Sequence, residues 1–93
     1  MSFDWNSGAA RLLKAEIARE GLTLARLAAR LQRLGLDETE ASVKNKLYRG
    51  TFSMAFFMQC MQALGHRSAD VTAVLPEDML RGAGLDPEGE IPT

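Results

Sequence analysis

The chain has 93 residues, of which 46% are apolar and 25% charged, a composition typical of one small folded domain rather than of a disordered or fibrous chain. A single cysteine, Cys60, excludes an internal disulfide, and with the single histidine, His66, it is too few for a structural zinc site. No stretch approaches the ~20 apolar residues of a membrane span, and residues 1–6 do not resemble a secretion signal, so we expect a cytoplasmic protein without metal or cofactor.

The net charge of −1 combines two unlike parts of the chain. Residues 1–67 hold ten Lys and Arg against six acids, a charge of +4, whereas residues 68–93 hold one Arg against six acids, a charge of −5. Such an asymmetry is typical of a nucleic-acid-binding body with an acidic tail, although proteins that bind nothing charged also reach +4.

Apolar residues recur at spacings of three and four in blocks separated by glycine, which predicts helices. The first predicted helix runs from the N-cap Ser7 to Glu20. The second begins at the N-cap Thr23 and carries an apolar stripe as far as Leu34. A parallel stripe of arginines lies beside it: Arg26, Arg30 and Arg33.

The third predicted helix covers about 40–49, and Asp37 or Thr39 could cap it; Asp37 has Glu40 three residues on, the spacing of a capping box. The fourth runs from the cap Ser53 to Leu64, contains no charge, and must be buried on more than one side.

After Gly65, Val71, Val74 and Leu75 indicate a short packed element. Pro76 would begin a last turn reaching Leu80, followed by a frayed acidic tail to Thr93. We therefore expect an all-α, compact four- to five-helix bundle in residues 1–75, followed by a short turn or helix and an acidic tail in 76–93.

Residues that could carry catalysis are sparse. Cys60 lies between Gln59 and Met61 in the apolar fourth helix and is most simply a small core residue. His66 follows the end of the same helix, where a structural or surface role is expected. The sequence therefore does not predict an enzyme.

The third helix has the side chains of a DNA-recognition helix. At 100° per residue, Val43 and Leu47 share the inward face. Arginine can pair with guanine, asparagine with adenine, and lysines and hydroxyls with phosphates. The residues expected to contact DNA are Thr39, Ser42, Lys44, Asn45, Lys46, Tyr48 and Arg49 on this helix, with Arg26 and Arg30 on the one before. The same side chains could equally form a solvated surface.

The sequence shows two family resemblances, of which only the first implies DNA binding. Leu27-Ala28, Leu34-Gly35, Val43, Leu47 and Gly50, within about Leu22 to Gly65, resemble the phage-repressor-like helix-turn-helix family. That resemblance implies a DNA-binding domain of about five helices, often dimeric, that regulates transcription. More specifically, residues 39–46 (TEASVKNK), 49–50 (RG) and 52–60 (FSMAFFMQC) resemble a family of small bacterial domains of unknown function, over about Arg11 to Gly65.

Two features depart from the repressor-like pattern. Leu24 follows the capping threonine, where that family commonly has glutamine. The distance from Leu27 to Gly50 is several residues longer than usual, so the second helix or the turn after it must be extended.

The fourth helix indicates a possible contact with another protein. Phe56 and Phe57 point about 100° apart, and a small domain can hardly bury both together with Met54, Met58 and Met61. We expect Phe56, Phe57, Met58 and Met61 to form a homodimer or partner interface unless the first helix and residues 71–80 cover them. The leading hypothesis is thus a DNA-binding transcriptional regulator, associated with the nucleoid when bound. The alternative is an adaptor that uses residues 53–64 and the C-terminal segment without binding DNA.

Overall fold

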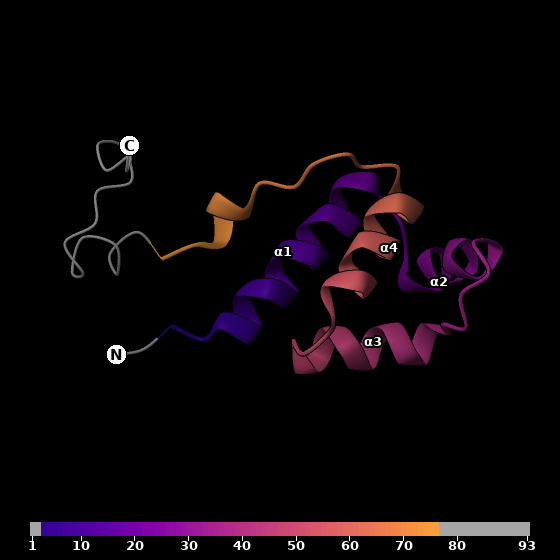
Figure 1. Cartoon of the computed structure of the whole chain (residues 1–93), viewed down its shortest axis with the longest axis horizontal. Coiled ribbons are helices and arrows are strands. Elements are labelled where there is room, and N and C mark those ends of the chain that lie inside the picture. Colours follow the sequence, from indigo (N-terminus) through magenta and orange to yellow (C-terminus); the bar gives the residue numbers. More distant parts are fainter. Residues whose placement is uncertain (1–2, 77–93) are drawn as a thin grey trace.

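A computed structural model describes residues 3–76 as four α-helices and one short 3₁₀ turn, with no strand in this range (Figure 1). The elements are α1 (Trp5–Glu20), α2 (Leu24–Arg33), α3 (Glu40–Arg49), α4 (Met54–Leu64) and the turn η1 (Val71–Val74). The all-α expectation is confirmed. The predicted turn beyond Pro76 and the acidic tail lie outside the described residues.

The start of α1 differs from the prediction, which was wrong in choosing Ser7 as the cap. Asp4 is the N-cap, and its carboxylate accepts hydrogen bonds from the backbone N–H groups of Asn6 (3.1 Å) and Ser7 (3.2 Å). The Ser7 hydroxyl donates to the other carboxylate oxygen at 2.9 Å. These bonds, that of the Ser7 side chain above all, lower the pKa of Asp4. Ser7 thus lies within the first turn and reinforces the cap.

Helix α2 begins as expected, because the Thr23 hydroxyl accepts from the N–H of Arg26 at 3.2 Å. It ends one residue early, and Leu34 is an exposed C-cap rather than the last member of the apolar stripe. Since α2 has only ten residues, the extra length lies in the connection, which comprises the six residues 34–39.

A capping box opens α3, but it is formed by Thr39 and Ser42 rather than by Asp37 and Glu40. The Ser42 N–H donates to the Thr39 hydroxyl at 3.1 Å, and the Thr39 N–H donates to the Ser42 hydroxyl at 2.8 Å. Helix α4 has the predicted bounds, with Ser53 as N-cap and Gly65 as the left-handed C-cap.

The core lies where α1 and α2 each pack against both α3 and α4. Its members are apolar residues spaced for one face of each helix: Leu13, Ile17, Leu27, Ala28, Leu31, Val43, Leu47, Phe56, Cys60, Ala63 and Leu64. Cys60 is a core residue as predicted, and burial, followed by the charge of Glu38, raises the pKa of its thiol to about 12.

Gly50 fixes the position of α3 relative to α1. It is the left-handed C-cap of α3, with φ of 67°. A Cβ at this position would collide with the backbone carbonyl of Asn6 in the first turn of α1. Glycine is therefore needed here both for its conformation and for the close approach of α1.

The segment after α4 returns along α1, where η1 packs (Figure 1). The predicted short element is therefore present, but it is only partly covered, since Val71 and Leu75 remain exposed.

Candidate nucleic-acid interface

Helix α3 separates its side chains into a buried and an exposed set. Val43 and Leu47 are buried against the other helices, as their spacing predicted. Four of the expected DNA-contacting residues are exposed on the rest of the helix: Lys44, Asn45, Tyr48 and Arg49. Tyr48 has 88% of its surface exposed, and the only acid on α3 is Glu40 in the first turn. The arrangement offers a cationic, hydrogen-bonding surface on a helix whose orientation is set by the core.

The remaining predicted residues of this helix have partners within the chain. Glu38, buried in the connection before α3, receives a hydrogen bond from the Ser42 hydroxyl at 2.6 Å and an ion pair from Lys46 at 2.5 Å. The Lys46 ammonium also lies 4.5 Å from the centre of the Phe56 ring. Thr39 supplies the cap described above. Sequence periodicity contained no signal for this network, because Glu38 stands outside any helix.

The charge state of Glu38 follows from these contacts. Burial by itself would raise the pKa of Glu38, but the hydrogen bonds from Lys46 and Ser42, with the positive charge of Lys46, outweigh it and hold the pKa below the usual value. Glu38 is therefore ionised at neutral pH and neutralises Lys46. Among the residues that the structure describes, no acid forms an ion pair with Lys44 or Arg49, so these two supply the remaining positive charge of α3.

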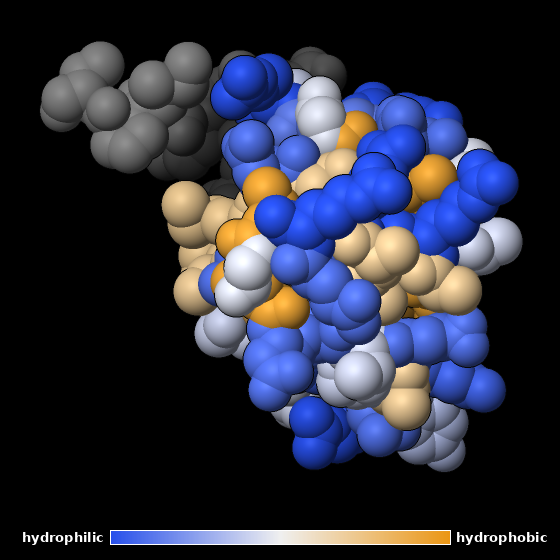
Figure 2. All heavy atoms as spheres, turned by 90° about the vertical axis from the view of Figure 1, so that its right-hand side faces the viewer, coloured by the Kyte–Doolittle hydropathy of each residue, from blue (hydrophilic) through white to orange (hydrophobic). Residues whose placement is uncertain are grey.

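The two expected contacts on α2 differ in their surroundings. Arg26 is exposed. Arg30 is half-buried, and its guanidinium donates to the carbonyl of Ala63 at 3.0 Å, at the C-terminal end of α4. Arg26, Arg30 and Arg33 line a hollow of about 270 Å³ together with Leu22 and Ala29. Figure 2 views the molecule from the α2 end, where hydrophilic side chains extend over paler apolar surface.

A second recess, the α1–α3 groove, lies between α1, the start of α2 and α3 and has a volume of about 420 Å³. The buried Ile17 and Leu47 lie beneath it, and the half-buried Leu22 and Leu24 supply its apolar surface. The exposed Lys14, Lys44 and Tyr48 border it. Lys14 had no place in the sequence-based site, because its proximity to Lys44 depends on how α1 packs against α3.

The residues of α4 that were expected to form a partner interface differ in their exposure. Phe56 and Met61 are buried within the chain, so they are not available to a partner. Phe57 is half-buried and Met58 is 63% exposed. Met54, another residue that a small domain was expected to bury with difficulty, is 71% exposed at the first position of the helix.

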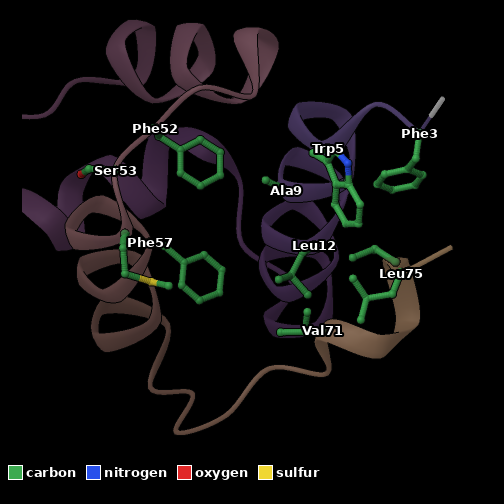
Figure 3. Close-up of a pocket in the computed structure, with 12 residues that line it drawn as sticks. Phe3, Trp5, Ala9, Leu12, Phe52, Ser53, Phe57, Val71 and Leu75 are labelled. Carbon is green, nitrogen blue, oxygen red and sulfur yellow. The ribbon is translucent and has the colours of Figure 1, made fainter. Parts of the chain in front are cut away.

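An apolar hollow of about 350 Å³ adjoins these residues. Phe52 and Phe57 lie on one side of it, and Trp5, Leu12 and Leu75 lie on the other (Figure 3). Its one hydroxyl, that of Ser53, accepts the capping hydrogen bond from Phe56 N–H at 3.0 Å. The lining that residues 3–76 give this hollow is therefore almost entirely apolar and includes no charged side chain.

His66, just beyond the end of α4, contacts two glutamates of α1. Its Nδ1 lies 2.8 Å from Oε1 of the buried Glu16, and its Nε2 lies 3.2 Å from Oε2 of Glu20. Arg19 donates to Glu16 at 2.8 Å. These contacts supply the partners that a buried carboxylate requires and join the C-terminal ends of α1 and α4. Within residues 3–76, no group of three or more His, Cys, Asp or Glu side chains is arranged to hold a metal ion.

None of the helices between residues 3 and 76 is both long and apolar enough to cross a membrane. No curated protein and no solved structure matches the chain. A protein family does match, over residues 5–69, which include all four helices. The chain belongs to the family described as "Domain of unknown function (DUF6471)".

Proposed function

We propose that the protein is a small DNA-binding regulator of transcription, in which α2 and α3 act as a helix-turn-helix pair and α3 enters the major groove. The observation that carries the proposal is the division of α3: Val43 and Leu47 are buried, while Lys44, Asn45 and Arg49 are exposed. A recognition helix needs this combination, because the core must hold it rigidly while its outer side chains reach base edges and phosphates. This role would associate the protein with the nucleoid in the cytoplasm.

The exposed side chains have separate roles in the proposal. Arg49 donates two hydrogen bonds to a guanine, and Asn45 pairs with an adenine. Lys44 and the Tyr48 hydroxyl contact phosphates, which adds affinity without adding sequence preference. Lys46 contributes less, since Glu38 already neutralises it.

Helix α2 supplies further phosphate contacts in the proposal. Arg26 is exposed, and Leu22 lines both the hollow beside Arg26 and the α1–α3 groove beside Lys44, so the two basic regions adjoin. Arg30 contributes less, since it donates to the end of α4. The six-residue connection is longer than the usual turn of three or four residues, yet α2 and α3 remain in contact.

Fluorescence anisotropy of labelled duplex DNA of mixed sequence, at low salt, tests the proposal. We expect binding that weakens steeply with salt. Lys44→Ala should weaken binding to all sequences and lower the salt slope by about 0.9, the value for one phosphate contact. Asn45→Ala should relax base preference, and Arg49→Ala should weaken binding to the preferred sequence about tenfold or more.

Arg67→Gln provides the matched control, because Arg67 is exposed beyond α4 and removing it changes the net charge by the same amount. Circular dichroism must show that every variant is folded. Absence of binding at low salt would refute the proposal, as would an Arg49→Ala variant that binds as tightly as Arg67→Gln.

A second proposal, an adaptor without DNA binding, is supported by the apolar hollow and the exposed methionines Met54 and Met58. Its test is a stable homodimer or heteromer measured by analytical ultracentrifugation. Met58→Asp should abolish the complex while the chain stays folded. A monomer that is unaffected by Met58→Asp, with no partner bound, would exclude this role.

A further inference from the structure

The α1–α3 groove is lined by both apolar and cationic residues. The half-buried Leu22 and Leu24 offer apolar contact, while Lys14 and Lys44 line the same recess from different helices. Among residues 3–76, the lining of the apolar hollow beside α4 includes no charged residue, whereas the hollow on α2 has three arginines together with Leu22 and Ala29. Small-molecule sites usually pair an apolar lining with a few converging polar groups.

Charge in the groove favours one sign of ligand. The lining contains Lys14 and Lys44 and, among residues 3–76, no acid. Neither lysine takes part in an ion pair between described side chains, in contrast to Lys46, which is bound to Glu38. The groove therefore has positive charge to offer an anion. Tyr48 adds a phenol to the lining, which can donate a hydrogen bond or stack on a flat ring.

We infer that the α1–α3 groove binds a small carboxylate with an apolar body, such as an aryl carboxylate. The carboxylate lies between Lys14 and Lys44, and the body covers Leu22 and Leu24. The volume of about 420 Å³ falls within the range of small-ligand pockets. A free inorganic anion would leave the apolar surface uncovered, and an uncharged ligand would leave both ammonium groups without a partner.

Binding in this groove also changes the surface of α3. Lys44 and Tyr48 line the groove and belong to the face proposed to contact DNA. A bound carboxylate neutralises Lys44 and holds Tyr48, so ligand and DNA compete. This consequence rests on the proposed function, whereas the ligand site itself does not.

The ligand site is tested by titrating the ¹⁵N-labelled full-length chain with 2-naphthoate and following backbone amide shifts by NMR. The largest shifts are expected at groove residues such as Ala18, Leu24 and Tyr48, with small shifts at Ala9 and Phe57 in the apolar hollow. The neutral 2-naphthylmethanol should bind about tenfold more weakly. Lys14→Gln and Lys44→Gln should each weaken naphthoate binding about threefold, as expected for partly exposed ion pairs, and Arg67→Gln should not.

Three results would overturn the site: no shifts at millimolar naphthoate, shifts confined to the apolar hollow, or equal affinity for the alcohol and the acid. Competition is measured separately, by adding naphthoate to the labelled DNA complex. Release of DNA by naphthoate but not by the alcohol supports it, and undiminished DNA binding at saturating naphthoate refutes it. Failure of the protein to bind DNA would refute the proposed function and leave the outcome of the titration standing.

Discussion

Removing the ammonium of Lys46 should destabilise the fold even though the residue is partly at the surface. In a Lys46→Met variant the stem remains but Glu38 loses its ion pair, retaining the bond from Ser42. Deleting one partner of a fully buried pair costs about 3–5 kcal/mol, and an exposed pair contributes less than about 1 kcal/mol. The side chains of Glu38 and Lys46 are 10% and 30% exposed, so we expect a loss of about 2 kcal/mol.

The stability lost in the Lys46→Met variant should depend on pH. In the wild type the pKa of Glu38 lies below its usual 4.5, so the network stabilises the fold above that pH, and its contribution is lost as the pH falls through the lower folded value. In Lys46→Met, burial would dominate and raise the pKa of Glu38, which penalises the folded state at neutral pH. Acidification protonates Glu38 and removes this penalty. The difference between the two proteins is therefore largest near pH 7 and shrinks towards pH 4.

Urea unfolding followed by circular dichroism measures this difference. With a slope of about 1 kcal/mol per molar urea for a small domain, the midpoint should fall by about 2 M at pH 7. The double variant Glu38→Gln/Lys46→Met should recover part of the loss, because no buried charge is left without a partner. A loss below about 0.5 kcal/mol at pH 7, or one that is equal at pH 4 and pH 7, would refute the reasoning.

Further substitutions probe other contacts. Gly50→Ala should cost more than about 2 kcal/mol in urea unfolding, since left-handed strain and the collision with α1 act together; a cost below 1 kcal/mol would contradict this. Arg30→Met should lower stability by about 1 kcal/mol through loss of its hydrogen bond to α4, and an unchanged urea midpoint would count against that bond. Cys60, buried and with its pKa raised to about 12, should react with a thiol reagent at pH 8 only after urea unfolding; rapid labelling of the folded protein would disagree. Phe56→Asp should prevent folding, while Met58→Asp should leave the melting temperature nearly unchanged; similar losses in both would contradict their different burial.

The helices with local stop and start signals were predictable from the sequence. Thr23 and Ser53 cap α2 and α4, and Gly65 ends α4, because caps depend only on residues within one turn. The start of α1 was not predicted correctly, although its cap is also local. Asp4 precedes the exposed Trp5, which belongs to no apolar stripe, so the helix predicted from periodicity began too late in the sequence.

Contacts between segments were less predictable. The burial of Val43 and Leu47 follows from helical spacing. The ion pair between Lys46 and Glu38 does not, because it requires an acid in the irregular connection before α3 to be buried. Likewise, the burial of Phe56 and the exposure of Met58 depend on where α1 and α2 pack on α4. Lys14 and Lys44 are thirty positions apart in the sequence, and they line the same groove only because α1 packs against α3.

Helix α1 contributes residues both to the apolar hollow and to the α1–α3 groove, at different points along its length. Gly8, Ala9 and Leu12 line the apolar hollow, while Lys14, Ile17 and Ala18 line the α1–α3 groove. At 1.5 Å per residue, the centres of these two sets lie only about 10 Å apart along one rigid rod. Any rigid-body displacement of α1 therefore changes the shape of both the hollow and the groove, and a movement of α1 cannot alter one of them alone.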